Sequence, residues 1–386
     1  MMSKKSPQLR FEGFTDDWEE RKLGEVATFL NGRAYKQDEL LDSGKYKVLR
    51  VGNFYTNDSW YYSNMELGDK YYVDKGDLVY TWSATFGPHI WSGEKVIYHY
   101  HIWKVELSKF LDRNFTLQLL EADKARLLSS TNGSTMIHVT KGDMESKIVS
   151  IPNIDEQKQI GSFFKQLDET IALHQRKLDL LKEQKKGYLQ KMFPKNGAKV
   201  PELRFEGFAD DWEERKLGDE VRIVMGQSPN SENYTDDPND YILVQGNADM
   251  KNGRVFPRVW TTQITKQAKK DDLILSVRAP VGDIGKTAYD VVIGRGVAAI
   301  KGNEFIFQNL GKMKSDGYWT RYSTGSTFES INSTDIKEAI ISIPAIEEQN
   351  KIGSFFKQLD NTIALHQLKL DLLKEQKKGF LQKMFA

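Results

Sequence analysis

Two stretches of the chain contain residue types whose spacing could support chemistry. His99 and His101 alternate along an expected strand, so both imidazoles could serve as metal ligands, but no cluster of Asp, Glu or Cys nearby completes a site. Residues 282–287 (GDIGKT) resemble the end of a phosphate-binding loop, yet Pro280 stands where that motif has its first glycine. Neither stretch therefore predicts a metal or nucleotide site.

The motifs of a self-contained enzyme are missing from the sequence. The absence of cysteine excludes a thiol nucleophile, a disulfide framework and a zinc ribbon. No Asn or Asp is followed by Pro-Pro and an aromatic residue, the loop by which amino-methyltransferases hold a flipped base. No glycine-rich turn between a strand and a helix suits S-adenosylmethionine. We therefore expect no catalytic residue and no metal ligand.

The composition is that of an ordinary globular protein, with 39% hydrophobic and 28% charged residues. No apolar run approaches the roughly 20 residues of a membrane span, and the lysines near the N-terminus precede no hydrophobic segment. We expect a cytoplasmic protein. The net charge of +1 gives no global argument for nucleic acid, so any such role must rest on local placement.

The element that must position everything else occurs twice. Residues 160–193 and 352–385 are 34 residues long and differ only at Glu169/Asn361, Arg176/Leu368 and Tyr188/Phe380. Apolar residues recur in each copy with the heptad spacing of a coiled coil. We predict two long helices that pair through these seam residues: Ile160, Phe164, Leu167, Ile171, Leu178 and Leu181 in the first, and Ile352, Phe356, Leu359, Ile363, Leu370 and Leu373 in the second.

Polar residues also occupy equivalent seam positions, namely His174 with His366 and Lys185 with Lys377. Such residues lower stability but restrict register and orientation. Each helix is expected to begin after a proline, with acidic residues in its first turn that suit the positive end of the helix dipole.

The repeat also includes the start of each half. Residues 9–25 return as 203–219 with two changes, whereas the roughly 130 residues between the repeated ends barely resemble each other. The two middles still share short β-branched runs punctuated by Gly, Asn and Asp, such as residues 77–80 and 272–275, which is typical of a mainly β domain. Matching Gly-Ser-Thr segments stand at 133–135 and 325–327.

We therefore predict an α+β protein with a pseudo-two-fold internal repeat. Its expected parts are a first globule at 1–153, a helix at 154–194, a second globule at 195–345 and a helix at 346–386. The nine-residue connection 194–202 extends at most about 30 Å, whereas a helix of 34 residues spans about 50 Å. An antiparallel coiled coil within the chain satisfies this connection, and it would place the globules at opposite ends.

This duplicated order resembles the specificity subunit of type I restriction-modification enzymes. The resemblance covers essentially the whole chain. It rests on the Pro-x-x-Asp/Glu-Glu-Gln openings at 152–157 and 344–349, the twin helices after them, the Gly-Ser-Thr segments before them, and the Trp-x-x-x-x-Leu-Gly entries at 18–24 and 212–218.

The resemblance implies a non-catalytic subunit whose globules are target recognition domains, each reading one half of a split DNA site. The helices would hold the globules apart and dock two methyltransferase subunits. The partners would supply S-adenosylmethionine-dependent adenine methylation and, with ATP and Mg²⁺, an endonuclease that translocates DNA. Similar ends with dissimilar middles fit this reading, because identical partners would meet the ends and different ligands the middles.

Base edges are read best by Arg, Lys, Asn and Gln, and phosphates by Arg, Lys, Ser and Thr. On that basis the DNA-binding candidates are Arg33, Lys36, Lys47, Arg50, Asn53, Trp82 and Ser83 in the first globule, and Gln227, Ser228, Asn230, Arg278, Lys286, Arg295 and Arg321 in the second. Residues 226–229 (GQSP) resemble a loop found early in such domains, from which residues 31–34 (NGRA) depart.

Two other hypotheses stay open at the level of the sequence. A coiled-coil adaptor that binds proteins or glycans would fit the near-zero net charge. A self-contained DNA modification enzyme or nuclease would need a site that leaves no clear sequence pattern, and binding of S-adenosylmethionine by the isolated chain would favour it.

Overall fold

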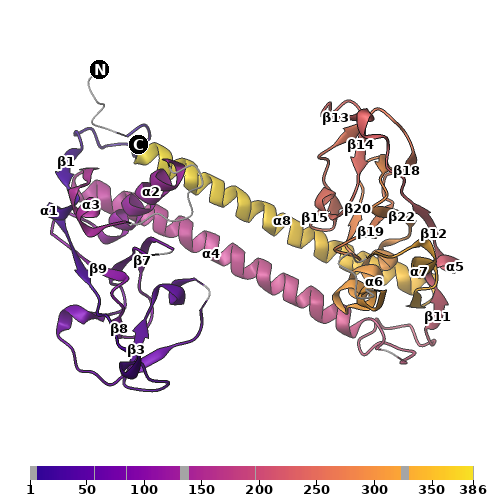
Figure 1. Cartoon of the computed structure of the whole chain (residues 1–386), viewed down its shortest axis with the longest axis horizontal. Helices are drawn as coiled ribbons and strands as arrows, with labels where there is room; N and C mark the ends of the chain where they lie inside the picture. Colours follow the sequence, from indigo (N-terminus) through magenta and orange to yellow (C-terminus); the bar gives the residue numbers. More distant parts are fainter. Residues whose placement is uncertain are drawn as a thin grey trace. The chain divides into compact units, whose positions relative to one another are not determined.

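The computed structural model describes residues 7–55, 57–83, 85–130, 139–195, 197–322 and 330–385. The chain forms two compact units, the first comprising Met1–His174 with Leu370–Ala386 and the second Gln175–Lys369. Each unit contains one globule and a segment of both long helices, α4 (Ile154–Lys191) and α8 (Ile346–Met384) (Figure 1). The Gly-Ser-Thr segments at 133–135 and 325–327 lie outside the described residues.

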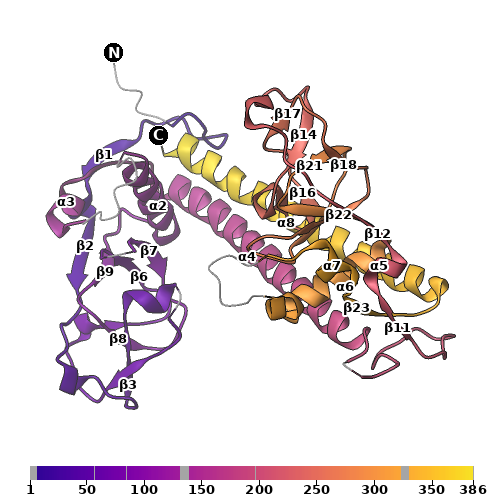
Figure 2. The same cartoon turned by 45° about the vertical axis from the view of Figure 1, so that its right-hand side comes forward.

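The globule of the first unit is built on two four-stranded sheets. The first sheet is visible in Figure 2 and has the order β2 (Ala27–Asn31), β9 (Ile102–Leu107), β6 (Leu78–Thr81), β7 (Gly87–Ile90). The second has the order β4 (Tyr61–Ser63), β3 (Tyr46–Leu49), β8 (Val96–Tyr98), β5 (Tyr72–Val73). A separate pair joins β1 (Glu19–Lys22) to β10 (Ile148–Ile151), so the first strand of the globule meets its last.

The globule of the second unit repeats this plan with extra strands. One sheet has the order β12 (Arg222–Met225), β22 (Val297–Lys301), β19 (Leu273–Ser276), β20 (Ile284–Lys286), β16 (Arg254–Val255), β15 (Met250–Lys251). The other has the order β13 (Tyr234–Thr235), β17 (Trp260–Thr261), β14 (Tyr241–Val244), β21 (Val291–Ile293), β18 (Lys266–Ala268). The closing pair is β11 (Glu213–Lys216) with β23 (Ile340–Ile343). The predicted pair of mainly β globules is confirmed.

The strand β6 is buried along its whole length, which explains why its residues are mostly apolar. Successive side chains of a strand point to opposite faces. Leu78 and Tyr80 enter one buried cluster, and Val79 enters another on the opposite face. The equivalent strand β19 does the same, because Leu273 and Leu275 pack on one side and Ile274 on the other. Both strands therefore lie between two hydrophobic layers.

Helices cover the globules and connect them to the long helices. The first unit has α1 (Leu23–Val26), α2 (Arg113–Ser130) and α3 (Lys141–Ser146). The second has α5 (Leu217–Glu220), α6 (Glu304–Ser315) and α7 (Ser333–Lys337). Four of these helices have side-chain N-caps, for example Asn303, whose amide oxygen accepts from the backbone N–H of Ile306 at the start of α6.

The two long helices pair antiparallel within each unit. In the first unit Phe163 contacts Phe380, with 5.1 Å between ring centroids, and five residues further along α4 Asp168 reaches back to Lys377. In the second unit Lys185 bonds Asp360, and Tyr188 contacts Phe355. As the residue number rises along α4, the residue number of the contacting position on α8 falls. The two helices are therefore antiparallel, as predicted.

The predicted seam residues are all at least partly buried. Buried are Ile160, Phe164, Leu178 and Leu181 of α4 and their equivalents Ile352, Phe356, Leu370 and Leu373 of α8. Half-buried are Leu167, Ile171, Leu359 and Ile363. The seam lysines, Lys185 and Lys377, form ion pairs with Asp360 and Asp168.

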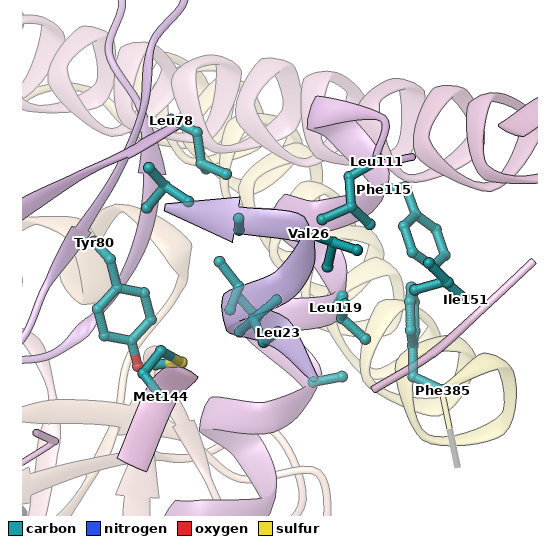
Figure 3. Packing of buried hydrophobic residues seen from close by; sticks show 14 of the residues in the cluster. Leu23, Val26, Leu78, Tyr80, Leu111, Phe115, Leu119, Met144, Ile151 and Phe385 are labelled. Atoms are coloured by element: carbon teal, nitrogen blue, oxygen red, sulfur yellow. The ribbon is translucent and has the colours of Figure 1, made fainter. Parts of the chain in front are cut away.

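Each hydrophobic core is completed by the end of a long helix from the other half of the sequence. Met384 and Phe385 lie in the core of the first unit. The Phe385 ring contacts Trp18, and it also contacts Phe115 (Figure 3). In the second unit the equivalent Phe193 contacts Trp212 and Phe305. The helix α4 ends at Lys191, before the expected residue 194, and Met192 and Phe193 after it are buried in this core.

Within the described residues, none of the helices combines the length and the apolar character that a membrane-spanning helix requires.

Candidate nucleic-acid interface

Four loop segments converge at one place in the first unit. The loop after β2 joins the end of β8, because the Arg33 N–H donates to the Tyr98 carbonyl at 3.0 Å. The end of β3 joins the β8–β9 turn through a bond from the His99 N–H to the Leu49 carbonyl at 2.9 Å. The segment after β6 joins the same turn, because the Trp82 N–H donates to the His101 carbonyl at 3.1 Å. We call this meeting point the loop junction of the first unit.

The second unit has the same loop junction. The Gln227 N–H donates to Ile293 at 2.8 Å, and the Gly294 N–H donates to Val244 at 2.8 Å. The Val277 N–H donates to Gly296 at 2.9 Å. These three bonds correspond one to one with those of the first unit, and they join the same four segments. The two junctions are therefore one backbone frame that carries two sets of side chains.

A glycine at the same place in each frame allows the backbones to approach. A Cβ atom on Gly32 would lie 2.4 Å from the His99 carbonyl oxygen, and one on Gly226 would lie 2.1 Å from the Gly294 carbonyl oxygen. Neither neighbour can give way easily, because each is backbone. The predicted correspondence between residues 31–34 and 226–229 is thus explained by a shared need for glycine.

The loop junctions bring together most of the DNA-binding candidates found in the sequence. Within the frames or one to four residues beyond them are Arg33, Lys36, Arg50, Asn53, Trp82 and Ser83 in the first unit, and Gln227, Ser228, Asn230, Arg278 and Arg295 in the second. Lys47 and Lys286 lie within strands and bond Glu94 and Glu304. Arg321 falls in a short 3-10 helix, Tyr318–Tyr322, and its side chain is outside the described part of the chain.

Several candidates of the first unit hold the loops in shape. The Arg33 guanidinium bonds the Glu39 carboxylate at 2.8 Å. The Asn53 side chain accepts from the Arg50 N–H at 2.9 Å and donates to the Ser59 carbonyl at 3.0 Å. The Arg50 guanidinium lies over the Tyr61 ring at 4.2 Å from its centroid. These contacts fix the loop after β3 before any ligand binds.

The second junction presents polar side chains to solvent. Gln227, Arg278 and Arg295 are exposed. Among the described residues, no carboxylate lies within 4.0 Å of the guanidinium of Arg278 or Arg295. Exposed guanidinium groups without an acidic partner are suited to phosphate oxygens and base edges.

The sequence reading did not place His99, Tyr100 and His101 among the DNA-binding candidates, although they form the β8–β9 turn. The Tyr100 ring lies 4.0 Å from the His101 ring and 4.4 Å from the His99 ring, between centroids. Burial lowers the pKa of His99 to about 4, with smaller effects of the neighbouring His101 and Arg50, and burial also lowers the pKa of His101. Both imidazoles are therefore neutral near pH 7, and the turn is aromatic rather than cationic.

The sequence did not predict a metal site at these alternating histidines. Within the ranges that the structure describes, no group of three or more His, Cys, Asp or Glu side chains is arranged to hold a metal ion. A sequence signal for the place of Tyr100 in the loop junction did exist, but it required aligning residues 99–101 with residues 294–296 through their flanking strands.

Comparison with known proteins identifies the family. The model of the type I restriction modification DNA specificity domain matches residues 15–183 and again residues 209–375. The chain belongs to this family.

Full-length relatives agree with the duplicated match. The chain is 26% identical to the MjaX specificity subunit of a type I restriction enzyme from Methanocaldococcus jannaschii, over 95% of this chain and 92% of that protein. It is 23% identical to the EcoBI specificity subunit of Escherichia coli, over 89% of this chain and 79% of that one. A crystal structure of the S subunit of a type I restriction-modification system from M. genitalium superposes with a TM-score of 0.70 at 17% identity, covering 99% of both chains. These matches establish a DNA specificity subunit built from two specificity domains.

In this specificity subunit a polar contact joins each globule to both long helices. The Gln118 amide of α2 donates to Asp168 of α4 at 3.1 Å, and the same carboxylate bonds Lys377 of α8 at 2.6 Å. The second unit repeats the arrangement with Gln308, Asp360 and Lys185, at 2.8 and 2.6 Å. One carboxylate in each unit therefore links a helix of the globule to both long helices.

The start of each long helix carries a second duplicated contact. The Arg10 guanidinium bonds both carboxylate oxygens of Glu156 at 2.7 Å, and Glu156 is fully buried. Arg204 and Glu348 form the equivalent pair at 2.8 and 2.7 Å. The acidic first turns predicted from the sequence thus have a more specific role, which is to bind the N-terminal segment of each half.

Leucines on the outer surface of the coiled coil are also duplicated. Leu173 and Leu180 of α4 correspond to Leu365 and Leu372 of α8, and all four are between 49% and 67% exposed. Each unit contains one leucine from each helix. The duplication therefore gives both units exposed leucines at equivalent positions of the coiled coil.

Proposed function

We propose that each unit of this specificity subunit reads one half of a bipartite DNA target through its loop junction. The first unit would use the segments around Arg33, Arg50 and Trp82, and the second those around Gln227, Arg278 and Arg295. The remaining candidates named from the sequence, such as Lys36 and Asn230, would contact the phosphates that flank each half-site.

One observation carries this proposal. The same hydrogen-bonded frame occurs twice, and the side chains that it presents differ between the two copies. The two ends of each half, residues 9–25 with 203–219 and 160–193 with 352–385, repeat nearly the same sequence, whereas the residues between them differ. A frame that is kept while its outward side chains change is expected when two copies of one domain read two different base sequences.

The long helices are proposed to set the distance between the half-sites. The 34-residue repeat within α4 and α8 is about 50 Å long as a helix, which corresponds to roughly 15 base pairs at 3.4 Å each. Two readers held at such a separation could address two segments of the major groove on one duplex.

We propose that two copies of a methyltransferase subunit dock on the exposed leucines of the coiled coil. A surface that occurs at equivalent positions of both halves suits two copies of one partner better than a single partner. In this proposal S-adenosylmethionine binds the methyltransferase subunits, and ATP and Mg²⁺ act in restriction subunits that join the complex. A location in the cytoplasm would follow for a prokaryotic host, because its DNA lies there.

The experiment for DNA reading uses the subunit assembled with its methyltransferase. The complex is incubated with a duplex pool of random sequence, and bound or methylated molecules are sequenced. We expect an enriched motif in two halves separated by a spacer of fixed length. A pool without any enriched split motif would overturn the proposed function and would favour an adaptor role.

The docking surface has a separate test. Leu173→Glu combined with Leu365→Glu places one carboxylate on the leucine surface of each unit, and we expect the methyltransferase subunits to be lost on size exclusion. The matched control, Gln166→Glu with Gln358→Glu, adds the same charge at exposed equivalent positions and should leave the complex intact. An intact complex for both pairs would rule out docking on the leucines.

A further inference from the structure

The turn between β21 and β22 is held rigidly in the second loop junction. Its first residue, Gly294, donates to Val244 at 2.8 Å, and its last, Gly296, accepts from Val277 at 2.9 Å. Between them the Arg295 N–H donates to the Ser228 hydroxyl at 3.1 Å. Arg295 therefore has a fixed backbone position from which its side chain extends.

Close packing leaves Arg295 as the side chain with which this turn can meet a ligand. A Cβ on Gly296 would lie 2.0 Å from the Gln245 carbonyl oxygen, so no larger residue fits there. Gly294 is bounded by Gly226 on one side and by Gln245 on the other. Arg295 itself is exposed, and no ion pair within the described residues occupies its guanidinium. Because the backbone of this turn is already ordered, binding a ligand costs only the conformational entropy of the Arg295 side chain and not that of the loop.

The equivalent turn of the first unit has the same frame and different chemistry. The Tyr100 N–H donates to the Arg33 carbonyl at 3.1 Å, at the position where Arg295 bonds Ser228. Tyr100 is 38% exposed, and the Trp82 indole N–H fixes its carbonyl at 2.9 Å. Its neighbours, His99 and His101, are uncharged near pH 7, so this turn presents an aromatic edge where the other presents a cation.

We infer that this three-residue turn determines the base sequence that each unit reads, with Arg295 contacting a guanine in one half-site and Tyr100 contacting bases of the other. The inference rests on the proposed function, because it assumes that the loop junctions meet DNA. A guanidinium bonds the O6 and N7 acceptors of guanine with two parallel hydrogen bonds, a pattern that no other base offers in the major groove. A tyrosine ring cannot make this contact and suits apolar groups such as the methyl group of thymine.

The test compares the motifs methylated by variant complexes in a random-sequence duplex pool. For Arg295→Ala we expect the preference for guanine to fall by about 10- to 100-fold at one position of one half-site, while the other half-site stays unchanged. Arg295→Gln should shift that position toward adenine, because a carboxamide pairs with adenine N6 and N7. Tyr100→Ala should alter the opposite half-site alone.

Arg222→Ala is the matched control. Arg222 is an exposed arginine of β12, at the end of the strand pair with β22 that lies away from the turn, and its loss should leave the motif as it is. A wild-type motif from Arg295→Ala would overturn the inference. So would a uniform loss of binding to all sequences, since that is the behaviour of a phosphate contact. If the unmodified complex yields no split motif, the proposed function itself fails.

Discussion

At the scale of single residues, the buried pairs of Arg10 with Glu156 and Arg204 with Glu348 show what the sequence could and could not reveal. An acidic first turn is a local pattern, and it correctly predicted that a helix begins there. The arginine partners lie 146 and 144 residues away, and no local pattern points to them. The seam leucines were predictable for the opposite reason, since heptad spacing depends on neighbours along one helix.

The pair of Arg204 and Glu348 leads to a prediction of stability. Arg204→Met leaves the buried carboxylate of Glu348 without its cation, so we expect the free energy of unfolding to fall by about 3–5 kcal/mol. Chemical denaturation followed by fluorescence measures this change. The double variant Arg204→Met with Glu348→Leu removes both charges and should recover most of the loss. If the double variant is as unstable as the single one, the pair does not act through charge.

His89 predicts how stability depends on pH. Burial, with a smaller effect of Lys124, lowers its pKa from 6.5 to about 4, and its ring stacks on Phe54 at 4.2 Å. Between pH 6.5 and 4 the unfolded chain takes up a proton at this site and the folded chain does not. The contribution of His89 to stability therefore falls as the pH is lowered from 7 to 5.

We expect the melting temperature of His89→Phe to fall less than that of the unmodified protein between pH 7 and pH 5. Phenylalanine keeps the ring contact with Phe54 and removes the titration. Glu121 lines the same cavity of about 390 Å³, and burial raises its pKa, so its contribution to stability grows as the pH falls, opposite to that of His89. This contribution is the same in the unmodified protein and in His89→Phe, so it cancels in the comparison. Equal acid sensitivity of the two proteins would contradict the assignment to His89.

At the scale of elements, the sequence predicted the helices better than the sheets. The long helices begin at Ile154 and Ile346, two residues after the prolines that predicted them. The loop junctions could not be foreseen, because they depend on which strands pair across the chain. The candidate residues were chosen by type, and strand pairing then decided which of them meet.

The contact between α4 and α2 gives a prediction with an internal control. A Cβ on Gly161 would lie 2.7 Å from the Phe115 N, whereas nothing lies within 4 Å of a Cβ on Gly187 further along the same helix. We expect Gly161→Ala to destabilise the first unit, because the two helices must separate. Gly187→Ala should instead stabilise the protein by about 0.5–1 kcal/mol, through its effect on helix propensity alone.

Thermal unfolding of both variants tests this contrast. The opposite signs distinguish close packing of α2 on α4 from a general effect of alanine in a long helix. A stabilising effect at both glycines would show that the two helices are not in close contact at Gly161.

At the scale of the whole molecule, the proposed function relates the length of the repeated helices to the length of the DNA spacer between the two half-sites. Because their seam repeats every seven residues, whole heptads can be removed from both without changing which residues face each other. Deleting residues 178–184 together with the equivalent residues 370–376 removes seven residues from each helix, which is about 10 Å of helix length. The polar contacts of Asp168 and Asp360 with their lysines, and the cores at the helix ends, lie outside the deleted segments.

If the long helices set the half-site distance, this double deletion shortens the preferred spacer by about three base pairs and leaves both half-site sequences intact. The measurement is the motif selected by the complex from a random duplex pool. A single deletion, in α4 alone, is the control. It leaves the two helices unequal and displaces one seam against the other, so we expect loss of assembly rather than a shorter spacer. An unchanged spacer in a fully assembled double-deletion complex would show that something other than the coiled coil measures the DNA.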